Sequence, residues 1–351
     1  MMKKKDGIRK ILIVKPSSLG DILHVFPALA LLKKHYPDAV LDFLINPEFD
    51  TLLDYSPFPV RRRIHFQRKK LAKASSVLPE LFKLFRELRQ ERYDLVVDFQ
   101  GLLRSSFFAW ISAHKRQSLF GFSNPREPAA KLFYDNAVPV NSVHAVQKNV
   151  ELVNSITERK DPVPDFDIPA MGEIEQSDRP LPEHYLVLFP GARWESKCFP
   201  VELFAEIVKR IHAQQKHVHF LIAGSKADIS KAEEIRNLLP CNIPVENIAG
   251  KTSLNQLFGV IRHADCVISN DSGPMHIAAL LKTPVFSFFG STDPEKTGPW
   301  MQLDRVFCIE LPCSRCMSRI CPRNQIICHK IDPERVAESV LSQIYSKESS
   351  C

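Results

Sequence analysis

The chain has 351 residues, enough for two domains of ordinary size, and its 44% hydrophobic and 25% charged residues are typical of soluble globular proteins. No apolar run approaches the roughly 18 residues of a membrane-spanning helix. The apolar run at residues 11–14, after the basic residues 1–5, is too short for a signal peptide, so we expect a cytosolic protein. The formal net charge of +7 favours an anionic partner: phosphate, nucleic acid or an acidic membrane surface.

Strands and helices alternate in the N-terminal half. Apolar runs predict buried strands at residues 11–14, 40–45 and 94–99. A helix with regularly spaced apolar residues follows the first strand and ends before Pro37, with Pro27 as a point of kinking. Residues 77–92 have the pattern of an amphipathic helix. Strands separated by helices of this length indicate a parallel, doubly wound α/β sheet.

A proline-rich stretch at residues 161–183 leaves little room for a helix or a central strand, and it predicts a linker. After it the alternation repeats. Strands are expected at residues 185–189, 218–223, 266–269 and 285–289, and helices at residues 201–212, 226–239, 253–263, 275–281 and 332–345. We therefore predict an N-terminal domain (residues 1–160), the linker, a C-terminal domain (residues 184–331) and a final helical segment (residues 332–351). Ligands are expected in a cleft between the domains.

The predicted strand at residues 266–269 leads directly into a turn and then an apolar helix. Gly273 and Pro274 suit a tight strand-to-helix turn, and the N–H groups at the helix start make a site for phosphate. Asp271, Ser272 and His276 add side-chain groups at the same strand end, where open α/β sheets bind ligands. A capped junction that binds no ligand fits the same spacing.

The nine cysteines of a cytosolic chain favour thiols or metal ligands over disulfides. Cys313, Cys316, Cys321 and Cys328 lie close together after the last predicted core strand, with His329 adjacent. Such a cluster can bind a structural zinc ion, although its spacing is not that of a standard zinc ribbon or finger. Packed free thiols and labile disulfides are the alternatives, and none of the three makes these residues catalytic.

Several motifs resemble those of one enzyme family. Residues 15–24 (KPSSLGDILH), 189–197 (FPGARWESK), 270–276 (NDSGPMH) and 290–294 (GSTDP) are similar to signatures of glycosyltransferase family 9, the ADP-heptose lipopolysaccharide heptosyltransferases. Residues 98–105, 126–128, 132–134 and 143–146 resemble in particular the enzymes that add the first core heptose. The resemblance covers roughly residues 9–300. It implies the GT-B architecture: two Rossmann-like domains facing across a cleft, with a final helix returning to the first domain.

The resemblance implies an inverting transfer of heptose from ADP-heptose that needs no metal for catalysis. Asp21 would take the proton from the acceptor hydroxyl. Lys197 and the helix start at residues 271–276 would stabilise the leaving ADP. Without the motifs, Asp21 also suits a first-turn carboxylate that stabilises a helix N-terminus, and Lys197 suits an ordinary solvated lysine.

The donor site of the family maps by resemblance onto Ser17, Ser18, Gly20, Arg193, Asp228, Thr252, Asp271, Ser272, Gly273 and His276. Asp228 lies where the family has a ribose-binding carboxylate, although relatives carry Glu there. Thr252 lies where the backbone contacts adenine, and a backbone contact tolerates a change of side chain.

The implied acceptor is the anionic Kdo-lipid A inner core, and not a nucleic acid. The predicted acceptor-binding residues are Lys69, Lys70, Lys73, Arg126, His144 and Lys148. The first three belong to a basic concentration together with residues 61–63 and Arg68, which also fits a solvated surface. Such a surface would hold the protein as a peripheral protein on the cytoplasmic face of the inner membrane.

Two other functions remain open from the sequence. The same fold and chemistry can serve another nucleotide sugar or another acceptor. A non-enzymatic anion- or membrane-binding protein can keep the scaffold, but the joint presence of Asp21, Lys197 and the turn at residues 271–276 argues against it.

Overall fold

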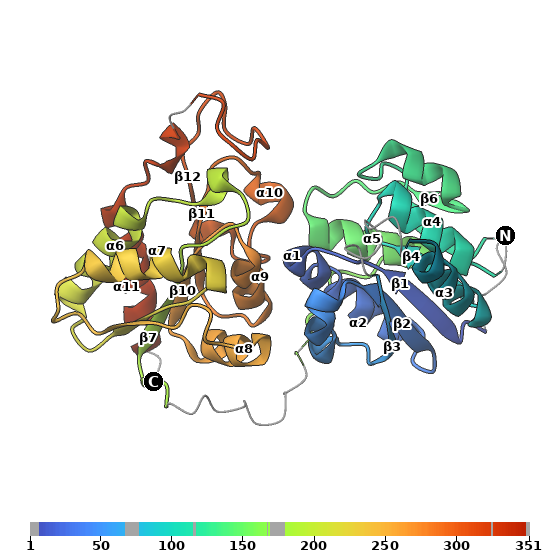
Figure 1. Ribbon diagram of the computed structural model, residues 1–351, viewed down its shortest axis with the longest axis horizontal. Helices are drawn as coiled ribbons and strands as arrows, with labels where there is room; N and C mark the ends of the chain where they lie inside the picture. The colour runs from blue at the N-terminus through green and yellow to red at the C-terminus, as the bar shows by residue number, and fades with distance from the viewer. Residues whose placement is uncertain are drawn as a thin grey trace. The chain divides into compact units, whose positions relative to one another are not determined.

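The computed structural model describes residues 7–66, 77–114, 117–166, 168, 180–323 and 326–348. The chain divides into two compact units, Met1–Met171 and Gly172–Cys351, and this division falls inside the predicted linker. Each unit, called here the N-terminal or the C-terminal domain, is a β-sheet with helices packed around it (Figure 1). Among the described residues, no helix combines the length and the apolar character that a membrane crossing requires.

The N-terminal sheet has six parallel strands in the order β3-β2-β1-β4-β5-β6. They are β1 (Lys10–Val14), β2 (Val40–Ile45), β3 (Val60–His65), β4 (Leu95–Asp98), β5 (Leu119–Phe122) and β6 (Asn136–Val138). The central strand β1 pairs with both β2 and β4, so that Ile11 lies opposite Leu41 and Leu95. Its apolar residues are buried, as expected for a parallel strand that is covered on both faces.

Helices connect these strands. They are α1 (Leu19–Leu23), α2 (Phe26–His35), α3 (Val77–Gln90), α4 (Leu103–Ser112) and α5 (Ala145–Thr157), with the 3₁₀ segments η1 (Pro47–Tyr55) and η3 (Pro128–Phe133). The single helix predicted after the first strand is in fact two helices. Pro27 lies in the first turn of α2, where its missing N–H costs nothing, and it therefore starts a new helix.

The C-terminal sheet repeats this topology. Its parallel strands have the order β12-β11-β10-β7-β8-β9, which is the order of the N-terminal sheet when β7 is counted as the first strand. The strands are β7 (Tyr185–Phe189), β8 (His219–Ile222), β9 (Val245–Asn247), β10 (Cys266–Asn270), β11 (Val285–Phe289) and β12 (Val306–Cys308). Two Rossmann-like sheets confirm the predicted α/β class. The bounds predicted for residues 185–189 and 285–289 are confirmed as β7 and β11.

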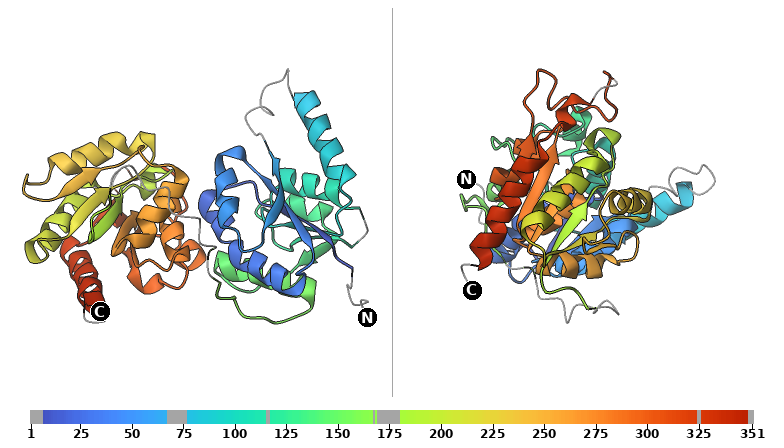
Figure 2. Two further views of the ribbon diagram at one scale, coloured as in Figure 1. Left: turned by 90° about the horizontal axis from the view of Figure 1, so that it is seen from below. Right: turned by 90° about the vertical axis from the view of Figure 1, so that its left-hand side faces the viewer.

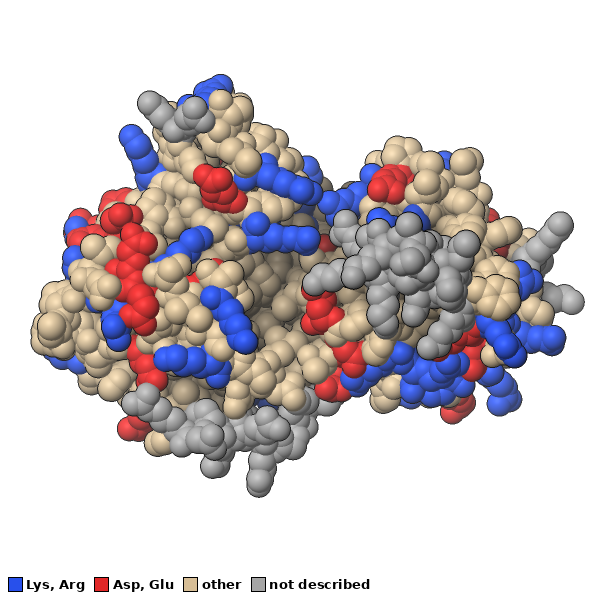
Figure 3. Space-filling view, viewed as in Figure 1, with Lys and Arg blue, Asp and Glu red and all other residues tan. Residues whose placement is uncertain are grey.

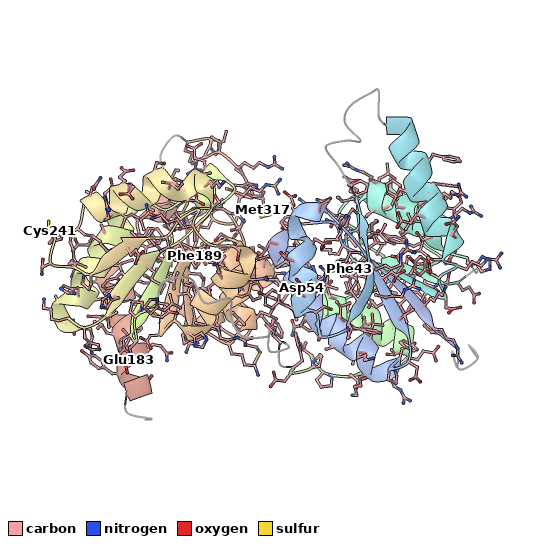
Figure 4. All side chains as sticks on the ribbon, turned by 60° about the horizontal axis from the view of Figure 1, so that its bottom comes forward. Phe43, Asp54, Glu183, Phe189, Cys241 and Met317 are labelled. Atoms are coloured by element: carbon pink, nitrogen blue, oxygen red, sulfur yellow. The ribbon has the colours of Figure 1, made fainter. Side chains whose placement is uncertain are left out.

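The elements around this second sheet are mostly helical. They are η4 (Glu195–Lys197), α6 (Val201–Gln214), η5 (Lys226–Asp228), α7 (Ile229–Asn237), α8 (Leu254–His263), α9 (Gly273–Leu280), α10 (Pro294–Thr297), η6 (Leu303–Arg305), η7 (Ile327–His329) and α11 (Pro333–Glu348). Phe43 of β2 and Phe189 of β7 lie in the two sheets (Figure 4) and are almost completely buried. Met317, in contrast, lies on the long loop after β12 and is more than half exposed.

The last helix, α11, belongs to the C-terminal domain. It packs along α6 (Figure 2) and buries Val336, Val340 and Ile344 in the hydrophobic core of that domain. The resemblance led us to expect that this helix returns to the N-terminal domain. That expectation stays a prediction; the apolar face of α11 is covered by its own domain.

Strand β3 corrects a prediction about charge. Arg61 donates hydrogen bonds of 2.9 and 2.5 Å to the two carboxylate oxygens of Asp42, which is completely buried. The other two arginines are also paired within the domain, Arg62 with Glu87 and Glu91, and Arg63 with Asp50 and Asp54. The first three members of the basic concentration therefore stabilise the fold. The other predicted members, Arg68, Lys69, Lys70 and Lys73, lie outside the described residues.

Both sheets contain the feature at which open α/β sheets bind ligands. The strand order reverses between β1 and β4 in the N-terminal sheet, and between β7 and β10 in the C-terminal sheet. Loops that leave such neighbouring strands run to opposite sides and open a crevice at the carboxyl ends of the strands. Predicted site residues follow three of these four strands: the catalytic Asp21 after β1, the catalytic Lys197 after β7 and the donor-binding Asp271 after β10.

Candidate active site

The loop after β1 brings a lysine and an aspartate together. Lys15 directly follows the strand, is buried, and donates a hydrogen bond of 2.9 Å from Nζ to the carbonyl oxygen of Phe99. Asp21 lies in the first turn of α1, and its carboxylate accepts hydrogen bonds from the N–H and the hydroxyl of Ser18, at 3.0 and 2.8 Å. The loop is therefore closed on itself, and the orientation of the Asp21 carboxylate is fixed.

The buried lysine controls the charge of this aspartate. Burial alone would raise the pKa of Asp21, but Lys15, the hydrogen bonds from Ser18 and the nearby His24 together lower this pKa to about 2. Burial lowers the pKa of Lys15, whereas Asp21 and Asp98 oppose that shift by favouring the ammonium form. Asp21 is consequently an ionised carboxylate throughout the neutral pH range.

A second carboxylate organises the loop after β4. Asp98 is completely buried and accepts hydrogen bonds from Gln100 N–H (2.8 Å), the Ser105 hydroxyl (2.9 Å) and the Tyr134 hydroxyl (2.8 Å). Burial raises the pKa of Asp98 in spite of these bonds. Gln100 in turn accepts a hydrogen bond of 3.3 Å from the N–H of Ser17. Asp98 therefore joins the loops after β1 and β4 into one wall.

A pocket opens beside this wall, at the carboxyl edge of the N-terminal sheet. Polar groups from the loops after β1, β2 and β4 line one part of it, and Phe66 and Phe108 line another. The full lining is Pro16, Ser17, Leu44, Asn46, Phe66, Gln100, Leu102, Arg104, Ser105 and Phe108. One of these lining residues, Ser17, lies four residues before Asp21 in the sequence.

The predicted acceptor residues fall into two groups. Arg126 is exposed on a loop that packs against Gly101, and its charge lowers the pKa of Lys15, so the structure brings it to the Asp21 region. His144 instead caps helix α5, since its Nδ1 accepts a hydrogen bond of 3.2 Å from Val146 N–H, and it is buried. Lys148 follows in the first turns of the same helix. Lys69, Lys70 and Lys73 lie outside the described residues.

The C-terminal domain has its own lysine–aspartate pair. Lys197 Nζ lies 2.6 Å from Oδ2 of Asp271, and the same oxygen accepts a hydrogen bond of 2.5 Å from the Thr292 hydroxyl. The ammonium also lies 4.8 Å from the centre of the Trp194 ring, a cation–π contact. This ion pair therefore connects the loops after β7 and β10, the two strands at the switch point.

Helix α9 begins directly beside this pair. Ser272 is its N-cap and shares a hydrogen bond of 3.2 Å with the Ser269 hydroxyl, and Gly273 and Pro274 form the first helical positions. His276 lies in the first turn. The first N–H groups of a helix have no partner within the helix, and the helix dipole makes this end positive. The Lys197 ammonium and the α9 N-terminus thus form one electropositive site suited to phosphate.

The loops after β7 and β8 meet at Asp228, the predicted ribose ligand. Its carboxylate accepts hydrogen bonds from the N–H and the hydroxyl of Ser225, at 2.8 and 2.7 Å. A Cβ atom on Gly191 would lie 2.1 Å from Asp228 Oδ1, so the loop after β7 approaches this carboxylate closely and a side chain at position 191 would force it to shift. Thr252 follows Gly250, whose N–H donates to the Gly224 carbonyl at 2.9 Å. Arg193 is exposed on the loop after β7.

The cysteine-bearing loop, residues 309–329, contacts Ser196, the residue directly before Lys197. The neighbouring Ser196 donates to the carbonyls of Ser318 (2.6 Å) and Arg319 (3.2 Å), and its own carbonyl accepts a hydrogen bond of 2.9 Å from His329. The Arg319 guanidinium lies 5.4 Å from the Trp194 ring centre. Nothing in the sequence motifs indicates this contact, because the two segments are more than a hundred residues apart.

The zinc hypothesis concerns four cysteines of this loop. Within the part of the chain that the structure describes, no group of three or more His, Cys, Asp or Glu residues is arranged to hold a metal ion. Cys313, Cys316, Cys321 and Cys328 carry free thiols. Burial raises the pKa of Cys328, and the other three cysteines, which lie near it, raise it further. A structural zinc at these cysteines stays a prediction, with packed free thiols and labile disulfides as its alternatives.

The chain is similar to known proteins of one family. Residues 81–327 match the model of glycosyltransferase family 9 (heptosyltransferase). The chain is 30% identical to lipopolysaccharide heptosyltransferase 3 of Escherichia coli, over 80% of this chain and 83% of that protein. It is 28% identical to lipopolysaccharide heptosyltransferase 1 of Pseudomonas aeruginosa, over 97% and 99% of the two chains. The structure of the E. coli heptosyltransferase WaaC with ADP aligns with a TM-score of 0.74 at 24% identity, covering 96% of this chain and 99% of that one.

These matches, together with the two Rossmann-like domains, define the class of protein: an enzyme, a glycosyltransferase of the GT-B type. More narrowly, the chain belongs to glycosyltransferase family 9, the heptosyltransferases.

Three groups at these sites were not among the predicted site residues. Lys15 stands first in the motif at residues 15–24, and a lysine directly after a buried strand is itself a signal of a functional site. Asp98 with Tyr134, and Thr292, also lie inside motifs that resemble the family. Their roles depend on contacts across the fold, which no local pattern encodes.

Proposed function

We propose that this enzyme transfers heptose, with inversion, from ADP-heptose to the Kdo-lipid A inner core of lipopolysaccharide. One observation carries the proposal: each domain places a lysine–aspartate pair at its switch point, and the two pairs expose opposite charges. The N-terminal pair presents a carboxylate, Asp21, and the C-terminal pair presents an ammonium, Lys197. A glycosyl transfer needs both, a base for the acceptor and a cation for the leaving diphosphate.

Asp21 is assigned the acceptor side. Its carboxylate, with a pKa of about 2, is ready at neutral pH to accept a hydrogen bond from the acceptor hydroxyl. Such a carboxylate is too weak a base to deprotonate a free hydroxyl. It takes the proton as the new C–O bond forms, because the attacking oxygen becomes acidic at that moment.

Lys197 and the N-terminus of α9 are assigned the leaving group. As the bond from the sugar to the diphosphate breaks, negative charge grows on the phosphate oxygen. The ammonium and the unpaired N–H groups around Ser272 and Gly273 stabilise this charge without a metal ion. Asp271, held by Thr292, orients the lysine until the diphosphate arrives.

The rest of the donor is assigned to neighbouring loops. Asp228 would bind the ribose hydroxyls and the backbone at Thr252 the adenine, while Arg193, His276 and residues 17–20 (Ser17, Ser18 and Gly20 among them) would complete the donor site. The match to a relative whose structure contains ADP supports an adenine nucleotide. Arg126 and Lys148, with Lys69, Lys70 and Lys73, would bind the anionic acceptor. His144 would act through its cap on α5, next to Lys148.

The experiment is a transfer assay with purified protein, Kdo-lipid A and a panel of nucleotide sugars, run with and without excess EDTA. We expect turnover with ADP-heptose, far less with ADP-glucose or UDP-sugars, and no loss in EDTA. Turnover with another donor would assign a different sugar to the same chemistry. EDTA inhibition that Mg²⁺ reverses, with the fold intact, would overturn the metal-independent mechanism. Failure to turn over any donor would leave only a binding function.

A further inference from the structure

Helix α4 of the N-terminal domain carries large apolar residues on its outer face as well as on its inner face. Its inner face, which includes Phe108 and Ala109, is buried against the sheet. Its outer face carries Leu103, Phe107 and Trp110, spaced by three or four residues and 45%, 40% and 52% exposed. A solvent-facing helix surface normally carries polar side chains, so an aromatic stripe here calls for a partner.

The neighbouring segment η3 enlarges this surface. η3 packs against α4 and contributes Leu132, which is 85% exposed, and Phe133. The rings of Phe107, Trp110 and Phe133 contact one another, with centroids 5.9 to 6.2 Å apart. We call Leu103, Phe107, Trp110, Leu132 and Phe133 the aromatic surface. Figure 3 shows mostly uncharged surface, with a few charged side chains among it, at the upper edge of the N-terminal domain.

Charged residues of both signs lie at the edge of the aromatic surface. Arg104 on α4 and Lys131 on η3 are both exposed. The carboxylate of Glu127, which lines a groove on the aromatic surface, accepts a hydrogen bond of 2.7 Å from Leu103 N–H. Arg104 also lines two hollows: the pocket next to Ser17, and a shallow groove on the aromatic surface between Leu103, Phe107 and Phe133. The aromatic surface is therefore continuous with the pocket beside the catalytic loop.

We propose that the aromatic surface docks the enzyme onto an anionic lipid bilayer, with Trp110, Phe107 and Leu132 at the level of the lipid headgroups and Arg104 and Lys131 on lipid phosphates. Amphipathic aromatic side chains favour the membrane interface, and basic residues near an anionic surface strengthen the binding. The inference rests on the proposed function, because a lipid-linked acceptor has its acyl chains in the bilayer and only its sugars outside. The continuity through Arg104 would carry those sugars from the bilayer surface to the pocket next to Asp21.

Vesicle co-sedimentation of the full chain tests this surface directly. One vesicle is phosphatidylcholine alone, and the other is an equal mixture of phosphatidylethanolamine and phosphatidylglycerol. The test variant is Phe107→Ser/Trp110→Ser/Leu132→Ser. The matched control is Met301→Ser/Leu303→Ser, which removes exposed apolar residues (79% and 45% exposed) from the C-terminal domain. A further variant, Trp110→Phe, keeps an aromatic ring but removes its indole fluorescence.

We expect the wild type and the control to bind the anionic vesicles, and the triple variant to bind them at least ~10-fold more weakly. Brominated lipid should quench Trp110 fluorescence, so Trp110→Phe should keep the binding and lose that quenching. Transfer to Kdo-lipid A in vesicles should fall with the binding, whereas transfer to the de-acylated, water-soluble acceptor should stay unchanged in the triple variant.

The outcomes separate this proposal from the proposed function. Vesicle binding that depends on the aromatic surface, in a protein that transfers no heptose, would uphold the docking surface and reject the assigned reaction. Equal vesicle binding by the wild type and the triple variant would overturn the docking surface whatever the activity. A change of oligomeric state in the triple variant, without a change in vesicle binding, would assign the surface to a second copy of the chain and overturn the proposal.

Discussion

Each domain has a lysine–aspartate pair at its switch point, but the more buried member differs. It is the lysine in the N-terminal domain and the aspartate in the C-terminal domain. In the N-terminal domain Lys15 is the buried member, and Asp21 is the member at the catalytic loop. In the C-terminal domain Asp271 is buried, with 5% of its side chain exposed, and Lys197 is more accessible at 18%. Each pair is nearly neutral, which limits the cost of placing charges at a buried strand end.

This difference shows how one topology supports opposite chemistry. Both sheets have the same strand order, and both pairs lie at a switch point. The sign of the charge offered to a ligand follows from which member of the pair is less buried. The buried member tunes or orients the other: Lys15 lowers the pKa of Asp21, and Asp271 holds the ammonium of Lys197.

The largest effect is expected at Asp21. Asp21→Asn keeps an oxygen that can accept the hydrogen bonds from Ser18, so the loop should keep its fold, but the amide is not a base. We expect kcat to fall ~10²- to 10⁴-fold in a transfer assay. Asp304→Asn, an exposed aspartate 71% accessible at its side chain, is the control and should keep full activity. Near-normal kcat in the Asp21 variant would remove this residue from the mechanism.

Lys197→Gln should lower kcat by ~10²-fold, because it removes the cation at the leaving diphosphate and leaves Asp271 as an unpaired buried charge. The double variant Lys197→Gln/Asp271→Asn removes that second defect, so it should recover part of the lost activity. A double variant that is no better than the single one would show that Asp271 does not act through Lys197. Circular dichroism and thermal unfolding check that both variants are folded.

Lys15→Met should shift the pH dependence of kcat/KM. In the wild type the pKa of Asp21 lies at about 2, below its ordinary 3.8. Ionised Asp21 is therefore available at all pH values above roughly 4, and its contribution to stability is lost only as the pH falls through about 2. Without Lys15 the effect of burial raises this pKa, so an acid limb of kcat/KM should appear at higher pH. Lys296→Met, at an exposed lysine, should leave the profile unchanged; an identical profile in Lys15→Met would contradict the coupling.

The smallest effect is expected at Arg319, which contacts the Trp194 ring near Lys197. Arg319→Ala removes a cation–π contact with Trp194 worth about 0.5–1 kcal/mol, so kcat should fall only ~2- to 5-fold. Arg319→Lys should restore most of it, and the pH profile set by Asp21 should not change in either variant. A loss of thermal stability that accounts for the whole activity change would make Arg319 structural only.

Much of the fold could be predicted from local patterns. Continuous apolar runs gave the central strands, and β7 and β11 have the expected bounds, because a buried parallel strand is apolar along its whole length. Strand β3 could not be recognised in this way. It lies at the sheet edge, and its Arg61, Arg62 and Arg63 look like a solvated basic segment until their carboxylate partners on other elements are known.

The site was predictable in part. The motifs led to Asp21, Lys197 and Asp271, and the structure brings the last two into direct contact. The burial of Lys15, the contacts between Ser196 and the cysteine loop, and the packing of α11 on α6 all join residues far apart in sequence. Such contacts depend on the completed fold, and a local pattern carries no information about them. Cysteine spacing likewise left a structural metal, free thiols and labile disulfides open, and no group of three or more metal-ligating residues is arranged to hold a metal ion among the described residues.

Binding of ADP by titration calorimetry tests the central claim, that the N-terminal pair serves the acceptor and the C-terminal pair the donor. Lys197→Gln should weaken ADP binding ~10-fold or more, the value of a charge-assisted hydrogen bond to phosphate. Asp21→Asn should bind ADP within about 2-fold of the wild type, although its kcat is the more strongly reduced of the two. Equal weakening of ADP binding in both variants, or weakening in Asp21→Asn alone, would contradict the division of roles between the two pairs.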